Sequence, residues 1–136
     1  MIGDMRFLLF TMGEKLYLCR ESLIERIVSV KKEDLYSAPF GPPWLKYLMV
    51  YDGMVIPIIK EHEEILCEKM YNIVILKKVF NFVGFFIDFI EKFVDIDEDV
   101  ISKAIFTPVF MAQKAIIFDD RECYLLDIDA LLEGRE

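Results

Sequence analysis

Short apolar runs separated by turn-forming residues recur along the chain, and this pattern is typical of β-strands. The runs at 7–12 and 16–19 enclose a Gly-Glu-Lys turn, which predicts a hairpin. The runs at 48–51 and 54–59 enclose Asp52-Gly53, and Asp-Gly between apolar runs is among the strongest hairpin signals. We therefore expect a fold that is built mainly from hairpins.

The remaining segments contain few helical signals. Pro57 lacks a backbone N–H, so its strand should lie at a sheet edge or carry a bulge. The apolar run at 83–94 is long enough to bend and to serve two sheets. The other expected elements are a strand within 22–30, a short helix over 44–47 that begins at Pro43, a charged loop at 60–69, a strand at 71–76, a helical turn at 100–101, a hairpin over 115–128 with its turn at 119–122, and a terminal helix from 129.

The number and spacing of these strands indicate the architecture. About nine short strands with few helices predict an all-β protein of the barrel class. The segments 51–58 and 118–128 both run from a strand through an acidic turn into an apolar strand, which two similar small barrels, one per half, would explain. No Gly/Ser-rich linker divides the chain, so we expect a single domain over 1–136 with a boundary between two subdomains at roughly 70–80.

Composition and charge exclude several classes of function. With 55% apolar residues, the 136-residue chain is not intrinsically disordered. Its net charge of −8 would repel a phosphate backbone, so we expect no nucleic acid as a partner. The apolar runs are far shorter than the roughly 18 residues of a membrane helix, so we expect no direct membrane insertion. An odd count of three cysteines and the lack of a signal-peptide pattern favour a cytoplasmic location.

Few side chains offer chemistry for catalysis or metal binding. The single histidine, His62, lies among three glutamates, and a charged surface loop explains this cluster as well as a metal site does. Asp88 lies in an apolar run, so it needs either a hydrogen-bond partner or an outward orientation. The aromatic segment 80–93 is interpreted as core packing. Because no nucleophile–base set and no glycine-rich phosphate loop is present, we expect a binding module with no enzyme activity, no metal and no cofactor.

Five segments together share their order and spacing with a known family. They are the hairpin at 7–17, the segment of Ser37-Ala38-Pro39 and Trp44-Leu45-Lys46, the stretch at 52–59, the stretch at 83–93 with its Val-Gly-Phe-Phe-Ile-Asp pattern, and the closing segment at 125–132. In this order they resemble the CheW family of chemotaxis coupling proteins over nearly the whole chain. Each segment alone is mostly apolar and therefore weak, but five in order are fairly specific.

The resemblance implies both a fold and a function. The implied fold is two packed five-stranded SH3-like β-barrels with few short helices. The implied function is a non-catalytic adaptor that couples the cytoplasmic tips of chemoreceptors to the regulatory domain of a CheA-type histidine kinase. By family position, the partner-binding residues would be Ile24, Arg26, Tyr51, Asp52 and Gly53.

Several residues depart from the family pattern. Arg26 stands where the family commonly has glutamate, Asp52 where it has arginine, and Lys60 where it has aspartate. Tyr47 and Lys114 replace glycines, so the backbone is expected to differ there. Because the first two changes are reciprocal, we expect Arg26 and Asp52 to lie within ion-pair distance. Such a reversal predicts altered partner specificity, although a compensated change on a surface that binds nothing would explain it equally well.

A second hypothesis comes from another class of function. The many phenylalanines could line an apolar cavity between the two barrels, which would make the chain a small-molecule sensor. Packing in an ordinary core accounts for the same residues. A well-formed apolar cavity of more than roughly 300 Å³ would favour the sensor.

Overall fold

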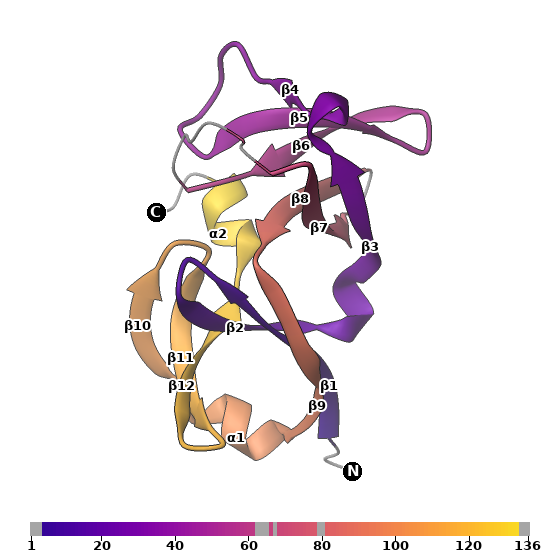
Figure 1. The fold of residues 1–136 in the computed structure, drawn as a ribbon. Helices are drawn as coiled ribbons and strands as arrows, with labels where there is room; N and C mark the ends of the chain where they lie inside the picture. Colours follow the sequence, from indigo (N-terminus) through magenta and orange to yellow (C-terminus); the bar gives the residue numbers. More distant parts are fainter. Residues whose placement is uncertain (1–3, 62–65, 67, 79–80, 134–136) are drawn as a thin grey trace. The chain divides into compact units, whose positions relative to one another are not determined.

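The chain forms two compact units, each with its own sheet (Figure 1). The computed structural model describes residues 4–61, 66, 68–78 and 81–133. The continuous unit is Leu23–Ile87, and the divided unit combines Met1–Ser22 with Asp88–Glu136. Each sheet has six strands, one more than the resemblance implies.

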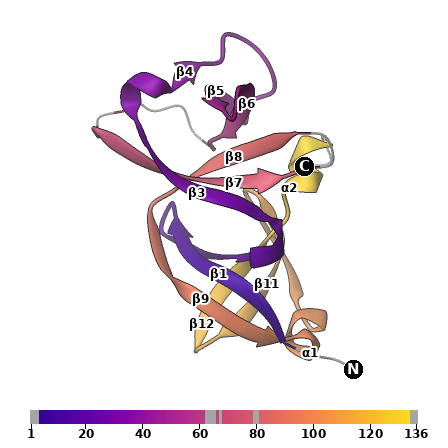
Figure 2. The ribbon, with the colours of Figure 1, turned by 90° about the vertical axis from the view of Figure 1, so that its right-hand side faces the viewer.

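The sheet of the continuous unit has the strand order β3-β7-β8-β6-β5-β4. Its neighbouring strands are antiparallel except for β6 and β8, and Figure 2 shows β3, β7 and β8 side by side. The elements are β3 (Ile24–Lys31), η2 (Lys32–Asp34), β4 (Tyr36–Ser37), β5 (Leu45–Tyr51), β6 (Met54–Ile59), β7 (Met70–Lys77) and β8 (Phe82–Ile87).

The sheet of the divided unit has the strand order β10-β11-β12-β2-β1-β9. Here β12 and β2 are parallel, so the N-terminal hairpin completes a sheet of C-terminal strands. The elements are β1 (Asp4–Met12), β2 (Lys15–Arg20), β9 (Phe89–Asp97), α1 (Glu98–Ser102), β10 (Ile105–Val109), β11 (Ala112–Phe118), β12 (Arg121–Leu126) and α2 (Ile128–Leu132), and the short 3₁₀ turn η1 (Glu21–Leu23) follows β2.

The two sheets have the same topology. Strands β10, β11, β12, β2, β1 and β9 of one sheet correspond in order to β4, β5, β6, β8, β7 and β3 of the other. The two segments that look alike in sequence are the equivalent hairpins β5-β6 and β11-β12. Each sheet draws strands from both halves of the chain, because β1 and β2 pair with β9 and β12, while β7 and β8 pair with β3 and β6.

Each unit has its own apolar core, which follows from the alternation of inward and outward residues along the strands. In the divided unit the buried cluster consists of Phe7, Leu9, Leu18, Val94, Ile96, Ile116 and Cys123. In the continuous unit it consists of Val30, Leu35, Tyr47, Met49, Ile56, Ile58, Ile73, Ile75 and Phe86.

Three hairpins close with two-residue turns in which both residues have positive φ. The φ angles are 58° and 69° for Gly13-Glu14, 51° and 76° for Asp52-Gly53, and 55° and 62° for Asp119-Asp120. These are the signs of a type I′ turn, whose twist matches that of the strands. The Asp-Gly prediction is confirmed, and the last turn is shorter than the predicted 119–122.

The structure tests the predicted helix over 44–47 and the predicted bend within 83–94. The predicted helix over 44–47 is wrong, because β5 begins at Leu45 and places Tyr47 opposite Ile58, with its side chain only 7% exposed. Burial against β6 outweighs the helix-starting signal of Pro43. The predicted bend within 83–94 is confirmed, since β8 and β9 belong to different sheets and are separated by Asp88.

Pro57 does not place its strand at an edge, because β6 lies between β5 and β8. On one side it opposes Leu48 of β5. On the other side the parallel pairing with β8 begins only at Ile58, which opposes Gly84. The missing N–H is therefore tolerated just before the second neighbour joins.

Candidate partner-binding site

The five predicted site residues lie at two places in the continuous unit. Ile24 and Arg26 are at the start of β3, and Tyr51, Asp52 and Gly53 form the end of β5 and the following turn. Arg26, Asp52 and Gly53 are exposed, while Ile24 and Tyr51 are half-buried. Glycine at the second position of this turn adopts its φ of +76° without the steric cost that a side chain would add.

Glu25 joins these two places. The register of β3 against β7 shifts between Ile24 and Arg26, so Glu25 is the extra residue of a β-bulge. The Tyr51 hydroxyl donates a hydrogen bond of 3.2 Å to Glu25 Oε2. Because β3 and β5 are not neighbours in the sheet, this bond shows that the sheet curls back on itself.

The charges of the site gather around the Tyr51 hydroxyl. Loss of hydration, the hydrogen bond to Glu25 and the carboxylates of Glu25 and Asp52 raise the pKa of Tyr51, while the positive charge of Arg26 opposes this shift. Among the described residues, however, no ion pair with an N–O distance within 4.0 Å joins Arg26 to Asp52. The structure therefore does not support the predicted pair, and Glu25 is the charged residue that reaches across.

An exposed apolar pair lies beside this charged cluster. Val50 and Val55 face each other across the β5-β6 hairpin and are 59% and 67% exposed. Together with Glu25, these valines are residues that sequence analysis missed. The available signals were the alternation of β5, which buries Met49 and turns Val50 outward, and the two adjacent charges before Ile27, which interrupt the alternation of β3.

The divided unit repeats the bulged glutamate. The register of β1 against β9 shifts so that Leu9 opposes Lys92 and Phe10 opposes Ile90, which leaves Glu91 as the extra residue. Glu91 accepts two hydrogen bonds from Arg121, at 3.0 and 2.9 Å. These bonds lower the pKa of Glu91 and raise that of Arg121. In both units a bulged glutamate thus reaches a residue next to a type I′ turn.

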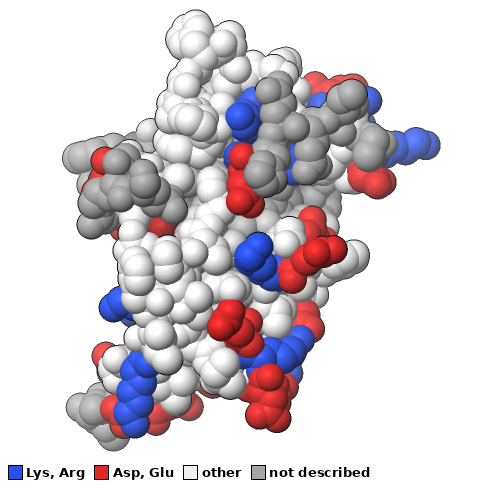
Figure 3. Space-filling model, turned by 90° about the vertical axis from the view of Figure 1, so that its left-hand side faces the viewer, with Lys and Arg blue, Asp and Glu red and all other residues white. Residues whose placement is uncertain are grey.

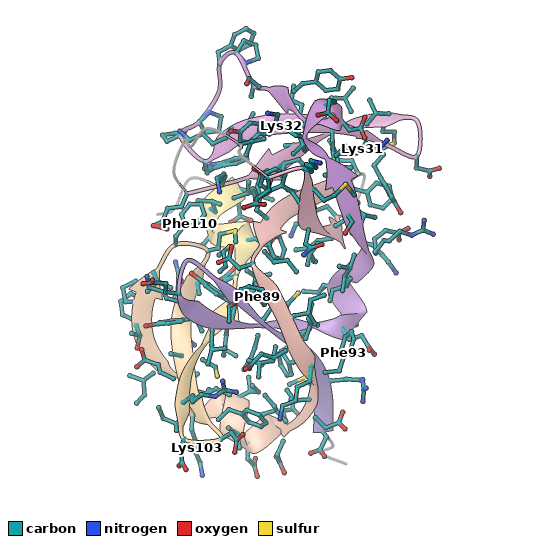
Figure 4. The ribbon with its side chains drawn as sticks, in the orientation of Figure 1. Lys31, Lys32, Phe89, Phe93, Lys103 and Phe110 are labelled. Atoms are coloured by element: carbon teal, nitrogen blue, oxygen red, sulfur yellow. The ribbon has the colours of Figure 1, made fainter. Side chains whose placement is uncertain are left out.

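Strand β9, at the edge of its sheet, exposes a second group of apolar side chains. Phe89, Ile90 and Phe93 are 72%, 44% and 39% exposed, and Figure 4 shows both phenylalanines on β9. The Arg6 guanidinium lies 5.3 Å from the centre of the Phe93 ring and pairs with Glu21 at 3.2 Å. Core packing explains the buried part of the aromatic segment but not these residues.

The other residues that depart from the family pattern contact only their near neighbours or keep an ordinary backbone. The Lys60 ammonium lies 4.9 Å from the centre of the Phe86 ring. The Tyr47 ring meets the same ring edge-on, with 5.5 Å between the two ring centres. Tyr47 and Lys114 are absent from the positions with positive φ, and each follows a shift of register in its hairpin. The substituted glycines therefore leave an ordinary extended backbone at both places.

The described residues include few groups suited to metal binding or nucleophilic catalysis. No group of three or more His, Cys, Asp or Glu side chains there could hold a metal ion, and no helix is long and apolar enough to cross a membrane. His62 and Cys67 lie outside this part of the chain. Burial raises the pKa of the Cys19 thiol to about 12, so it is not a nucleophile at neutral pH.

Two sheets of identical strand order, with exposed apolar residues on several strands, define a β-rich module. The family model of the CheW-like domain matches residues 6–136, so the chain belongs to the CheW-like family. CheW-like scaffolding proteins are non-catalytic, which confirms the prediction that the chain is not an enzyme.

A solved structure supports the same fold. The scaffolding protein TtCheW from Thermoanaerobacter tengcongensis is 18% identical, with a TM-score of 0.72 over 94% of this chain and 87% of that chain. At this identity the likeness concerns the fold. No curated protein sequence matches this chain closely enough to count as a relative.

Proposed function

We propose that this chain is a cytoplasmic adaptor that couples chemoreceptor tips to the regulatory domain of a CheA-type histidine kinase, with altered partner specificity. The observation that carries the proposal is the family match over residues 6–136. The binding surface proposed for one of these partners comprises Ile24, Arg26, Tyr51, Asp52 and Gly53.

The geometry of the continuous unit supports this choice of surface. Asp52 stands exposed on a rigid turn, and the exposed pair of Val50 and Val55 lies on the same hairpin. An apolar centre with a charged rim is typical of protein interfaces. A partner that fits should present a cation to Asp52 and an anion to Arg26, because like charges across an interface lower affinity.

Calorimetric titration of the chain with the kinase regulatory domain and with a receptor-tip fragment from the same organism tests the proposal. We expect affinity in the micromolar range or tighter for at least one of them, with a negative heat-capacity change. Asp52→Arg should weaken that binding roughly tenfold or more, because it replaces a negative charge of the rim by a positive one that repels the cation of the partner.

The equivalent turn of the other unit offers a matched control. Asp119 has φ of 55° against 51° for Asp52, and both occupy the first turn position. Asp119→Arg therefore imposes the same backbone cost and the same change of net charge, but it should leave the affinity unchanged. Equal effects of the two variants would count against the surface, and no binding to either partner would count against the adaptor function.

A further inference from the structure

A hollow of about 340 Å³ lies in the divided unit, between the end of α1 and the strands β10, β11 and β12. Pockets for small molecules begin at roughly this size. The hypothesis of a small-molecule sensor placed its cavity between two barrels, whereas this hollow lies within one unit. Figure 3 views the molecule from the side on which β10 and β11 lie in Figure 1, and uncharged surface, drawn white, covers much of that side.

The pairing of the strands explains the shape of the hollow. Ile105 of β10 opposes Ala115 of β11. Ile117 of β11 opposes Glu122 of β12, so all four side chains lie on one face of the sheet. The two isoleucines are 72% and 65% exposed, whereas Ala115 is 5% exposed. A single methyl group between taller side chains therefore leaves a depression with an apolar floor.

Two exposed side chains of opposite charge line this hollow. Lys103, labelled in Figure 4, directly follows α1, and Glu122 belongs to β12. Within the part of the chain that the structure describes, no ion pair with an N–O distance within 4.0 Å joins Lys103 to an acid. Glu122 Oε1 accepts a hydrogen bond of 2.5 Å from the Tyr124 hydroxyl. No hydrogen bond among the described residues engages its other oxygen, so the hollow presents a cation and an anion that are not paired with each other.

A hydroxyl group adds a further polar atom to the wall. The Thr107 hydroxyl donates to the Ile105 carbonyl at 3.1 Å, so its proton is engaged and its oxygen remains an acceptor. The oxygens of Thr107 and Glu122 suit an ammonium group, and the Lys103 ammonium suits a carboxylate. The polar groups of the hollow therefore match a ligand that carries both charges.

The charge of the unit distinguishes between ligands of different net charge. The continuous unit has eight acids and eight bases, so the net charge of −8 belongs entirely to the divided unit. Its field repels a small anion, and the Lys103 ammonium in the wall repels a small cation. A zwitterion has no net charge and can place each of its charged groups against the opposite charge in the wall.

We propose that this hollow binds an α-amino acid with an apolar side chain. Its carboxylate pairs with Lys103, and its ammonium group pairs with Glu122 and Thr107. The apolar side chain covers the methyl group of Ala115 between the two isoleucines. Because such a ligand has few atoms, we expect a dissociation constant of about 1 mM. This binding needs neither a kinase nor a receptor, so it goes beyond the proposed adaptor function.

Titration of the full chain with L-leucine at neutral pH, followed by amide NMR spectra, tests the proposal. We expect saturable shifts of the signals of residues 100–107, 115–117 and 122. Three matched probes each lack one part of leucine: 4-methylpentanoate lacks the amino group, 3-methylbutylamine lacks the carboxylate, and glycine lacks the side chain. Each should bind roughly tenfold more weakly or worse, because one contact of the hollow is then unmade. The absence of saturable shifts with leucine, or equal affinity for leucine and a truncated probe, overturns the proposal.

Removing each charge of the hollow tests the assigned contacts. Lys103→Gln should weaken the binding of leucine and of 4-methylpentanoate roughly tenfold, but not that of 3-methylbutylamine. Glu122→Gln, which keeps an acceptor for Tyr124, should weaken the binding of leucine and of the amine, but not that of 4-methylpentanoate. Both residues are exposed, so the variants should keep the fold.

Matched controls remove the same charges outside the hollow. Lys114→Gln is made at an exposed residue of β11 that opposes Phe106 and does not line the hollow. Asp120→Asn is made at an exposed residue in the adjacent turn. Both should leave the affinity for leucine unchanged. Equal losses in the controls and in the hollow variants would show a general effect of charge and would overturn the proposal.

The apolar floor is tested without a change of charge. Ala115→Leu should abolish the binding of leucine, because the added side chain fills the depression. Ile117→Ser, at a 65% exposed residue, should weaken it roughly threefold or more without burying new atoms. Circular dichroism shows whether both variants keep the sheet content of the parent, and undiminished binding of leucine by a folded variant of either kind contradicts the proposed contact.

Discussion

Asp88 shows how a single polar residue is accommodated between two apolar strands. Its carboxylate accepts a hydrogen bond of 2.9 Å from the Gly13 N–H, and its own N–H donates to the Thr11 carbonyl at 2.9 Å. Asp88 is exposed, and it ties the first hairpin turn to the bend between β8 and β9. The prediction that an acid in this run needs a partner or an outward orientation is confirmed on both counts.

Replacing Asp88 tests this bond. Asp88→Ala should lower the free energy of unfolding by about 1 kcal/mol, because the Gly13 N–H loses its acceptor. Urea unfolding of both proteins measures the difference. Asp88→Asn keeps an acceptor oxygen and should recover most of the loss, and equal losses for both variants would show that the hydrogen bond does not matter.

Bulges and turns act together at the scale of elements. In each unit an extra glutamate on the outer strand, Glu25 or Glu91, reaches a residue beside a type I′ turn. The partner is Tyr51 in one unit and Arg121 in the other. In an unbroken strand the side chains alternate strictly between the two faces of the sheet. The bulge interrupts this alternation and changes the direction in which the glutamate side chain points.

The pairing of Glu91 with Arg121 predicts a dependence of stability on pH. The pKa of Glu91 in the folded chain lies below its ordinary value of 4.5, chiefly because Arg121 donates hydrogen bonds to the carboxylate. A lowered pKa contributes stability that is fully present above the ordinary value and is lost as the pH falls through the lowered one. The loss should therefore begin only in the acid range.

Glu91→Gln removes this contribution. The variant should melt at a lower temperature than the parent at neutral pH, and the two melting curves should converge as the pH falls below the lowered pKa. Thermal unfolding monitored by circular dichroism over a pH series measures this. Glu33→Gln, at an exposed acid of the continuous unit, is the control for the loss of one negative charge.

The whole molecule combines strands from distant parts of the chain. The divided unit needs its first 22 residues and its last 49, whereas the continuous unit contains all six strands of its sheet between Leu23 and Ile87. Its buried cluster also lies entirely within these limits. The continuous unit therefore has what it needs to fold alone, although a domain of this size is only marginally stable.

A fragment of residues 23–87 should consequently keep a β-sheet spectrum and unfold cooperatively, at a lower temperature than the full chain. Circular dichroism and the dispersion of amide NMR signals measure both properties. A fragment of residues 1–69, which is similar in length but lacks β7 and β8, should be unfolded, since β3 and β6 then lose their central neighbours. A folded 1–69 fragment would contradict this view of the topology.

Much of the local structure could be predicted because it depends on local chemistry. Asp-Gly between apolar runs accepts positive φ at both turn positions, so the β5-β6 hairpin follows from four or five residues. The acids before residue 100 allow Asp97 to cap α1, accepting from the Asp99 N–H at 2.8 Å. The apolar run at 83–94 is too long for one short strand, so a bend between two strands, observed between β8 and β9, could also be predicted.

The predictions that were wrong or missing concern residues whose structure depends on distant parts of the chain. The residues at 44–47 carry a helix signal, yet they join β5 because burial of Tyr47 against β6 outweighs local propensity. Strand β10 was not predicted; it contains Pro108, which has no N–H for a strand ladder, and it lies at the sheet edge paired with β11. No ion pair within 4.0 Å joins Arg26 to Asp52; the bulged Glu25 instead accepts a hydrogen bond from Tyr51.

The sequence by itself determined the all-β class, the hairpin turns, the acidic surface and membership in the CheW-like family, because these depend on alternation, turn chemistry, charge and the order of motifs. Tertiary structure alone decided which hairpin completes which sheet, where the bulged glutamates point, and which apolar residues, such as Phe40 and Val55, remain exposed. Register and long-range pairing are set by the free energy of burying whole faces together, and no short segment of the chain contains that information.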